Sequence, residues 1–87
     1  MGQWKIIKTQ WVDGITATTA NTDFTHHVTF SQPLASSGNV LVIAQVVSYS
    51  NGFTVATSSV TTTGVDLVCN ARDTWGHEVM LFVIGKV

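Results

Sequence analysis

The amino-acid sequence predicts an all-β protein, a compact six-stranded antiparallel β-sandwich. Val, Thr, Ile and aromatic residues dominate the chain of 87 residues, and these residue types favour strands. Ala, Leu, Glu, Lys and Arg are too scattered to form a sustained apolar stripe with the helical period, so no helix is expected. Turn signals recur roughly every 8–12 residues, a spacing that is typical of small sandwiches.

The expected strands alternate in sequence between two faces. They cover residues 3–11, 25–31, 40–49, 53–60, 65–69 and 78–84. In the first strand, alternation places Trp4, Ile6 and Lys8 on one face. Asp13 and Gly14 then predict a turn, and the residues up to the second strand are expected to form a surface loop or a weak strand.

The central part of the chain predicts a hairpin. Pro33 ends the second strand because proline cannot donate a hydrogen bond to a neighbouring strand. Residues 40–49 are the most apolar strand and are therefore expected to be covered on both faces. The pair Asn51-Gly52 favours a tight turn, so residues 53–60 are expected to pair with residues 40–49.

The last two strands frame a polar loop. Val65, Leu67 and Cys69 are expected to share one face of the fifth strand. Residues 70–77 are expected to form a loop, and the sixth strand follows. Cys69 itself is interpreted as a small buried hydrophobic residue, because most cysteines on a strand face are buried.

Composition predicts assembly into a trimer. A chain this short buries only about 60–65% of its unfolded surface. Cys69 is the single cysteine, and no paired Cys or His residues have zinc-finger spacing, so neither a disulfide nor a structural zinc ion is available. Hydrophobic residues make up 45% and charged residues 10% of the chain, which leaves little charge for the surface of a small monomer. We therefore expect a homotrimer.

The same composition excludes several function classes. The net charge is −1 with four Lys and Arg residues, so no nucleic-acid partner is expected. The longest apolar run, residues 40–47, is far shorter than the roughly 20 residues of a membrane-spanning helix, so no membrane insertion is expected. Cys69, His77 and Asp73 could be written as a nucleophilic triad, but no local signature supports it. We expect no enzyme activity and no cofactor.

The order of several short motifs resembles a known family. These motifs are residues 28–33 (VTFSQP), 40–43 (VLVI), 60–64 (VTTTG), Cys69, 74–77 (TWGH) and 83–85 (VIG). In order and spacing they are similar to the H-type lectin domain and to the related receptor-binding tips of bacteriophage tail fibres. The resemblance covers about residues 25–87.

This resemblance implies a six-stranded antiparallel sandwich, a trimer, and glycan binding in loops at the end of the sandwich or between subunits. Asp23 lies near the position of an acidic sugar contact in the family. Secreted animal members carry extra cysteines that this chain lacks, which favours a tail-fibre setting. The chain is then a single lectin-like domain, a fragment or the C-terminal tip of a longer protein, on a virion tail fibre or outside the cell.

The residue types in the loop at residues 70–77 make it the candidate binding site, independently of the family resemblance. Protein sites for sugars combine an aromatic face with planar polar groups that hydrogen-bond to hydroxyls. Arg72, Asp73, Trp75 and His77 supply both. The alternative is that Trp75 packs in the core or an interface and that Arg72 and Asp73 form a surface ion pair.

Two histidines and two further tryptophans have more ordinary interpretations. Trp4 and Trp11 are interpreted as packing residues. His26 and His27 point to opposite faces of a strand and cannot bind one ion together. Either could meet its symmetry mates on a threefold axis, where three imidazoles could hold a metal or hydrogen-bond through water. No metal site is predicted.

Two functions from different classes follow. The first is a receptor-binding module that recognises a cell-surface glycan. The second is a structural trimerisation or capping module of a fibre or particle that binds no ligand. Glycan binding predicts that Trp75 and His77 are exposed in a shared cleft, whereas a structural cap predicts that both are buried.

Overall fold

A computed structural model gives the structure of residues 3–36, 38–47 and 52–86. These residues form strands and loops, and no helix is found among them. The strands are β1 (Trp4–Thr16), β2 (Phe24–Thr29), β3 (Val40–Val46), β4 (Phe53–Ser58), β5 (Gly64–Ala71) and β6 (Gly76–Lys86). The prediction of an all-β fold with six strands is confirmed.

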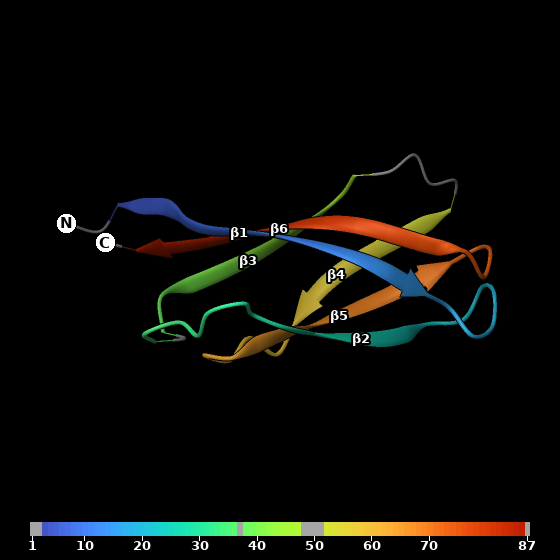
Figure 1. The fold of residues 1–87 in the computed structure, drawn as a ribbon, viewed down its shortest axis with the longest axis horizontal. Helices are drawn as coiled ribbons and strands as arrows, with labels where there is room; N and C mark the ends of the chain where they lie inside the picture. The colour runs from blue at the N-terminus through green and yellow to red at the C-terminus, as the bar shows by residue number, and fades with distance from the viewer. Residues whose placement is uncertain (1–2, 37, 48–51, 87) are drawn as a thin grey trace.

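The strands form two layers of three, with the orders β1-β6-β3 and β2-β5-β4 (Figure 1). Every pair of neighbouring strands is antiparallel. The consecutive strands β5 and β6 are the central strands of different layers, so the last third of the chain supplies the middle of both sheets. The sandwich is elongated, with extents of 44 × 20 × 18 Å.

The core lies between these two central strands. Alternate residues of β5 and β6 point inward and are fully or almost fully buried: Val65, Leu67, Cys69, Ala71, Val79, Leu81 and Val83. Burying each Val or Leu side chain stabilises the fold by about 1.5–3 kcal/mol relative to exposure. The predicted inward face of the fifth strand, formed by Val65, Leu67 and Cys69, is therefore correct.

The turn expected at Asp13 and Gly14 is instead a bulge inside β1. The register with β6 shifts between Val12 and Ile15, and Gly14 has a φ of 68°. This left-handed conformation costs glycine little, and one extra residue bends the strand without ending it. Val12 and Ile15 both point into the core as a result, and β1 continues to Thr16.

A second register shift, between Ile6 and Lys8, changes the faces of β1. It places Ile6 opposite Ile84 and Thr9 opposite Phe82, so Ile6 and Thr9 share the outer face. Lys8 pairs with Val83 on the other face. The expectation that Lys8 shares a face with Ile6 is therefore wrong, because simple alternation fails across a bulge.

The expected hairpin between residues 40–49 and 53–60 is wrong. β3 pairs with β6, whereas β4 pairs with β5, so the two strands belong to different layers. Asn51, in the expected turn, lies outside the described residues. The strand β3 is also an edge strand, and Leu41 and Ile43 on its outer face are exposed. The expectation that other residues of the chain cover both faces of β3 is therefore also wrong.

Side chains join the layers along both edges of the sandwich. On one edge, the Thr57 Oγ1 hydroxyl of β4 donates to the Val42 carbonyl of β3 over 2.9 Å. On the other, the Gln10 amide donates to the Thr29 carbonyl over 3.1 Å and accepts from the Ser31 N–H over 3.0 Å. The Gln10 side chain thus satisfies edge groups as a neighbouring strand would.

Candidate functional site

Two loops meet at the same end of the sandwich, where β1 and β5 end (Figure 1). Residues 17–23 connect β1 to β2, and residues 72–75 connect β5 to β6. Thr16 pairs with Gly76 in the last step of the β1–β6 ladder, so the two loops start side by side. The Asn21 N–H also donates to the Ala71 carbonyl over 2.7 Å. We call residues 17–23 and 72–75 together the loop end.

The predicted loop at residues 70–77 is shorter than expected. Asn70 and Ala71 complete β5, and Gly76 and His77 begin β6, which leaves residues 72–75 as the loop. Trp75 is 76% exposed there, more than any other large hydrophobic residue in the described part of the chain. Its indole therefore does not pack in the core of the chain, whereas packing of Trp75 at a subunit interface stays a prediction.

Asp73 fixes the conformation of this loop. Its Oδ1 atom accepts the Trp75 backbone N–H over 3.2 Å and lies 2.8 Å from His77 Nε2. The hydrogen bond with His77 is the main reason that the pKa of Asp73 lies below its ordinary value, and the Trp75 N–H acts in the same direction. The carboxylate thus connects an exposed tryptophan to a strand of the sheet.

His77 is placed differently from the expectation. The residue is 5% exposed, and its ring stacks on Phe53 with centroids 4.3 Å apart and an angle of 2° between the planes. The His77 ring packs on Phe53 and hydrogen-bonds to Asp73, and it thereby fixes the position of Asp73 in the loop. The structure therefore gives His77 a positioning role, and it does not share an exposed cleft with Trp75.

Arg72 is exposed at the first position of the loop. Its backbone N–H donates to the Gly52 carbonyl over 3.2 Å. Its side chain lies over Gly52, where a Cβ atom would come within 3.0 Å of it. The ion pair of Asp73 in the described part of the chain is with His77, so the surface pair of Arg72 and Asp73 that sequence suggested is not formed.

Asp23 belongs to the same end of the molecule. It accepts a hydrogen bond from the Asn70 Nδ2 amide over 2.8 Å, which ties the end of the first loop to β5. The carboxylate lines a hollow of about 160 Å³ together with Thr18, Thr19, Thr22 and Phe24. Sequence reasoning included Asn70 only as part of the predicted loop and missed the threonines. The density of Thr residues before Asp23 is the signal that could have found them.

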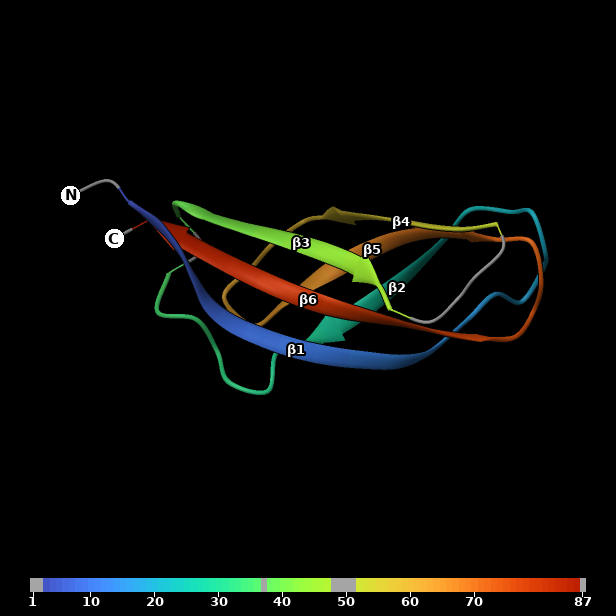
Figure 2. The same ribbon diagram turned by 90° about the horizontal axis from the view of Figure 1, so that it is seen from above.

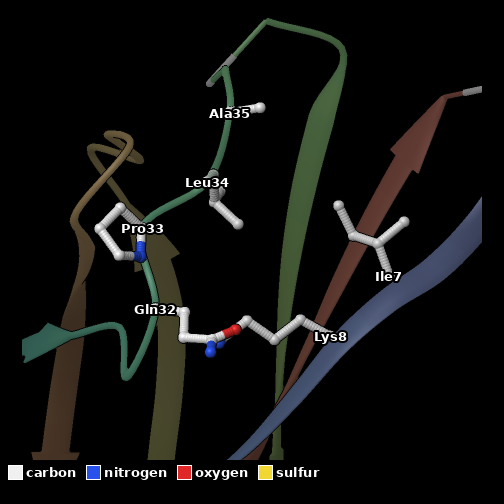
Figure 3. A pocket seen from close by; sticks show the side chains of 6 residues that line it. All are labelled: Ile7, Lys8, Gln32, Pro33, Leu34 and Ala35. Carbon is white, nitrogen blue, oxygen red and sulfur yellow. The ribbon is translucent and has the colours of Figure 1, made fainter.

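A second hollow, of about 230 Å³, lies at the opposite end of the sandwich. Ile7 and Lys8 of β1 face residues 32–35 across it (Figure 3). Lys8 Nζ also donates to Ser31 Oγ over 3.1 Å. No residue of this hollow was predicted to bind a ligand, and it contains no aromatic ring among its lining residues.

The remaining candidates are separate from the loop end. His26 points toward the inside of the sandwich and is half-buried, and His27 points outward, with Nδ1 at 2.7 Å from Asp66 Oδ1. Burial raises the pKa of the Cys69 thiol to about 11, and the thiol donates weakly to the Leu67 carbonyl.

Among residues 3–36, 38–47 and 52–86, no group of three or more His, Cys, Asp or Glu side chains is placed to hold a metal ion. The same residues include no helix with the length and apolar character needed to cross a membrane.

Comparison with family models, with curated proteins and with solved structures gives no match to this chain. The resemblance to the H-type lectin domain therefore stays a prediction, and the class that the structure defines is the antiparallel β-sandwich.

Proposed function

We propose that this protein is a carbohydrate-binding or receptor-binding module whose loop end recognises a cell-surface glycan, as a lectin or a phage-type tail-fibre tip does. The observation that carries the proposal is the exposure of Trp75 on a loop that Asp73 and His77 hold in one conformation. An indole that is ordered and exposed offers a preformed apolar surface, and binding loses little conformational entropy there.

The chemistry of the loop end suits a sugar. The faces of a pyranose ring are apolar C–H surfaces that pack on an indole, and its hydroxyls need paired polar partners. Asp23 lines a hollow at this end together with Thr18, Thr19 and Thr22. The Asn70 Nδ2 amide donates to Asp23 Oδ1 and thereby orients this carboxylate. Arg72 and Asp73 are the further polar partners, and no cofactor or metal takes part.

The binding at one loop end is weak in this proposal. Individual sugar sites of this kind bind with millimolar affinity, about −4 kcal/mol. A homotrimer displays three loop ends, and simultaneous engagement raises the overall affinity without any new contact. The module would act on a virion tail fibre or outside the cell, where dense surface glycans provide many identical ligands.

An array of host-type and bacterial surface glycans tests this proposal. Tagged wild-type protein is compared with a Trp75→Ala variant and with a Lys8→Ala control, which changes the hollow at the opposite end. We expect the first variant to lose at least tenfold in binding while it keeps its circular dichroism spectrum, and the control to bind like the wild type. A folded Trp75→Ala variant that still binds contradicts the proposal, as does loss of binding in the control.

A structural capping or trimerisation module with no ligand is the second candidate. The burial of His77 against Phe53 favours it, because a cap needs an ordered end more than an exposed one. This function predicts no binding to any glycan on the array. It also predicts that Asp73→Ala and Trp75→Ala weaken the assembly of the fibre or particle.

A further inference from the structure

The outer face of the β1-β6-β3 layer is apolar along most of its length. Figure 2 shows this layer nearest to the viewer, with β6 between the other two strands. The strand register aligns three rows of residues across the face: Ile6, Ile84 and Leu41; Thr9, Phe82 and Ile43; and Trp11, Met80 and Gln45. Trp4 extends the face at its end. We call these residues the apolar face.

The outer face of the other layer has the opposite character. Its cross-strand neighbours are polar or small with one exception: Thr25, His27 and Thr29 on β2, Asp66, Val68 and Asn70 on β5, and Thr54, Ala56 and Ser58 on β4. An antiparallel sheet with one solvated face shows such polar residues on that face. The outer face of the β2-β5-β4 layer is therefore suited to contact with solvent, whereas the outer face of the β1-β6-β3 layer is not.

We infer that the apolar face is the surface through which copies of this chain associate. Trp4, Ile6, Trp11, Leu41 and Ile43 are each about half exposed. Together with the less exposed residues of β6 they leave on the order of 600 Å² of apolar surface, which is at the upper end for a soluble monomer. A standard interface buries about 800 Å² per partner, of which somewhat more than half is apolar, so the apolar area of this face is of the order that one such contact contains.

The charged residues on this side of the layer stand beyond the three rows, with Lys86 paired to Trp4 at one end and Glu78 at the other. The rows themselves carry no charged residue, which favours a copy of the chain as the partner. The polar groups there are the neutral side chains of Thr9 and Gln45. Identical surfaces can meet on such a face without like-charge repulsion, and the face offers nothing to select a charged partner. A membrane surface fits less well, because interfacial binding to anionic lipids relies on Lys and Arg around the apolar residues, whereas Lys86 stands at only one end of this face and Glu78 at the other.

The arrangement of side chains suits three copies around one axis. The β1 side of the face carries the bulky Trp4 and Trp11, whereas the β3 side carries the smaller Leu41 and Ile43. When β1 of one copy packs on β3 of the next, these unlike surfaces meet, and such head-to-tail contacts form a three-membered ring when successive copies are rotated by 120°. The outward residues of β6, which are Met80, Phe82 and Ile84, then lie toward the axis. His26 and His27 lie on the other layer and are not at the axis.

This inference adds a subunit interface to the proposed function and does not depend on ligand binding. The loop end projects from the end of the strands and not from the apolar face (Figure 1). Self-association and glycan binding can therefore be tested, and can fail, independently.

Sedimentation velocity of a matched pair of variants tests the interface. Ile43 and Val68 are 49% and 41% exposed and lie on the outer faces of opposite layers. We expect wild-type protein and the Val68→Glu variant to sediment as trimers at about 20 µM, and the Ile43→Glu variant as a folded monomer. A wild-type monomer, an Ile43→Glu variant that stays trimeric, or equal dissociation of both variants overturns the inference.

Thiol protection gives a second readout that introduces no charge. Thr9 lies on the apolar face and Thr25 on the other layer, and both are exposed in the single chain. In the assembled protein, a Thr9→Cys variant should react with a maleimide at least tenfold more slowly than a Thr25→Cys variant. Equal rates overturn the inference even if the Ile43→Glu variant fails to fold.

Discussion

Replacing Phe53 with leucine tests whether the stack under the candidate site is energetically important. Phe53 is buried, and its ring lies 4.3 Å from that of His77 in a nearly parallel arrangement. A leucine keeps most of the apolar burial, so the change in packing costs less than about 1.5 kcal/mol. Loss of the ring pair adds about 0.5–1.5 kcal/mol. We expect the Phe53→Leu variant to lose about 1–2.5 kcal/mol in the free energy of unfolding.

A Phe30→Leu variant is the matched control. Phe30 is buried to a similar degree in the same core, but its ring is not stacked on His77. Chemical unfolding at one fixed protein concentration, followed by circular dichroism, should show that Phe53→Leu costs about 1 kcal/mol more than the control. For a domain of this size, that difference lowers Tm by roughly 4–8 °C.

A double-mutant cycle separates the ring pair from the rest of the core. Phe53→Leu and His77→Ala, made singly and together, should show a coupling free energy of about 0.5–1.5 kcal/mol. A coupling near zero, or equal costs for Phe53→Leu and Phe30→Leu, would refute the idea that Phe53 holds His77 and, through it, the loop of Trp75.

Three further outcomes follow from the structure. The pKa of Asp73 is lowered from 3.8 in the folded protein, so the charged carboxylate stabilises the fold above that pH. This contribution is lost as the pH falls through the folded-state pKa. Below about pH 4, the Tm should therefore fall less steeply with pH for Asp73→Asn than for the wild type. A Cβ at Gly64 would collide with the backbone oxygen of Val28, so Gly64→Ala should cost about 1–3 kcal/mol in chemical unfolding. Gly38→Ala, where a Cβ has ordinary clearance, should cost far less. With its pKa raised to about 11 and its side chain buried, the Cys69 thiol should resist iodoacetamide at pH 8 until the protein is denatured, and rapid labelling of native protein would contradict that burial.

Local patterns were sufficient to predict the fold class but not the pairing of the strands. Alternation identified the buried face of β5, because a strand that packs on one side shows its period directly. The Asn51-Gly52 pair suggested a hairpin, yet β3 and β4 pair with the distant strands β6 and β5. Strand partners depend on contacts between residues far apart in the chain, which a turn motif does not report.

The two bulges of β1 and the position of β3 were missed for related reasons. A bulge at Gly14 and a turn at Gly14 need the same backbone conformation, so the residue type does not distinguish them. The apolar residues on both faces of β3 predicted a central strand that is covered on both faces, but β3 lies at the edge of its sheet. In the structure the outer ones, Leu41 and Ile43, are exposed, which is the pattern expected of a face that another subunit covers.

The candidate site was predicted in part. Arg72, Asp73 and Trp75 lie in a loop at one end of the sandwich, as the residue types of the loop indicated, and Trp75 is exposed. Asp23, which was named through the family resemblance, lies at the same end. The burial of His77 could not be read from the sequence, because Phe53, which covers it, lies on a strand of the other layer.

The indole N–H signals of the three tryptophans provide the most direct test of the loop end as the binding site. Trp75 lies at the loop end, whereas Trp4 and Trp11 lie on β1. Isotope-labelled protein is titrated with the glycan that binds best on the array, and the three signals are followed by NMR. The proposed function predicts that the Trp75 signal shifts in a saturable way while those of Trp4 and Trp11 stay in place. A titration that moves the Trp4 or Trp11 signal and leaves Trp75 unchanged would contradict it.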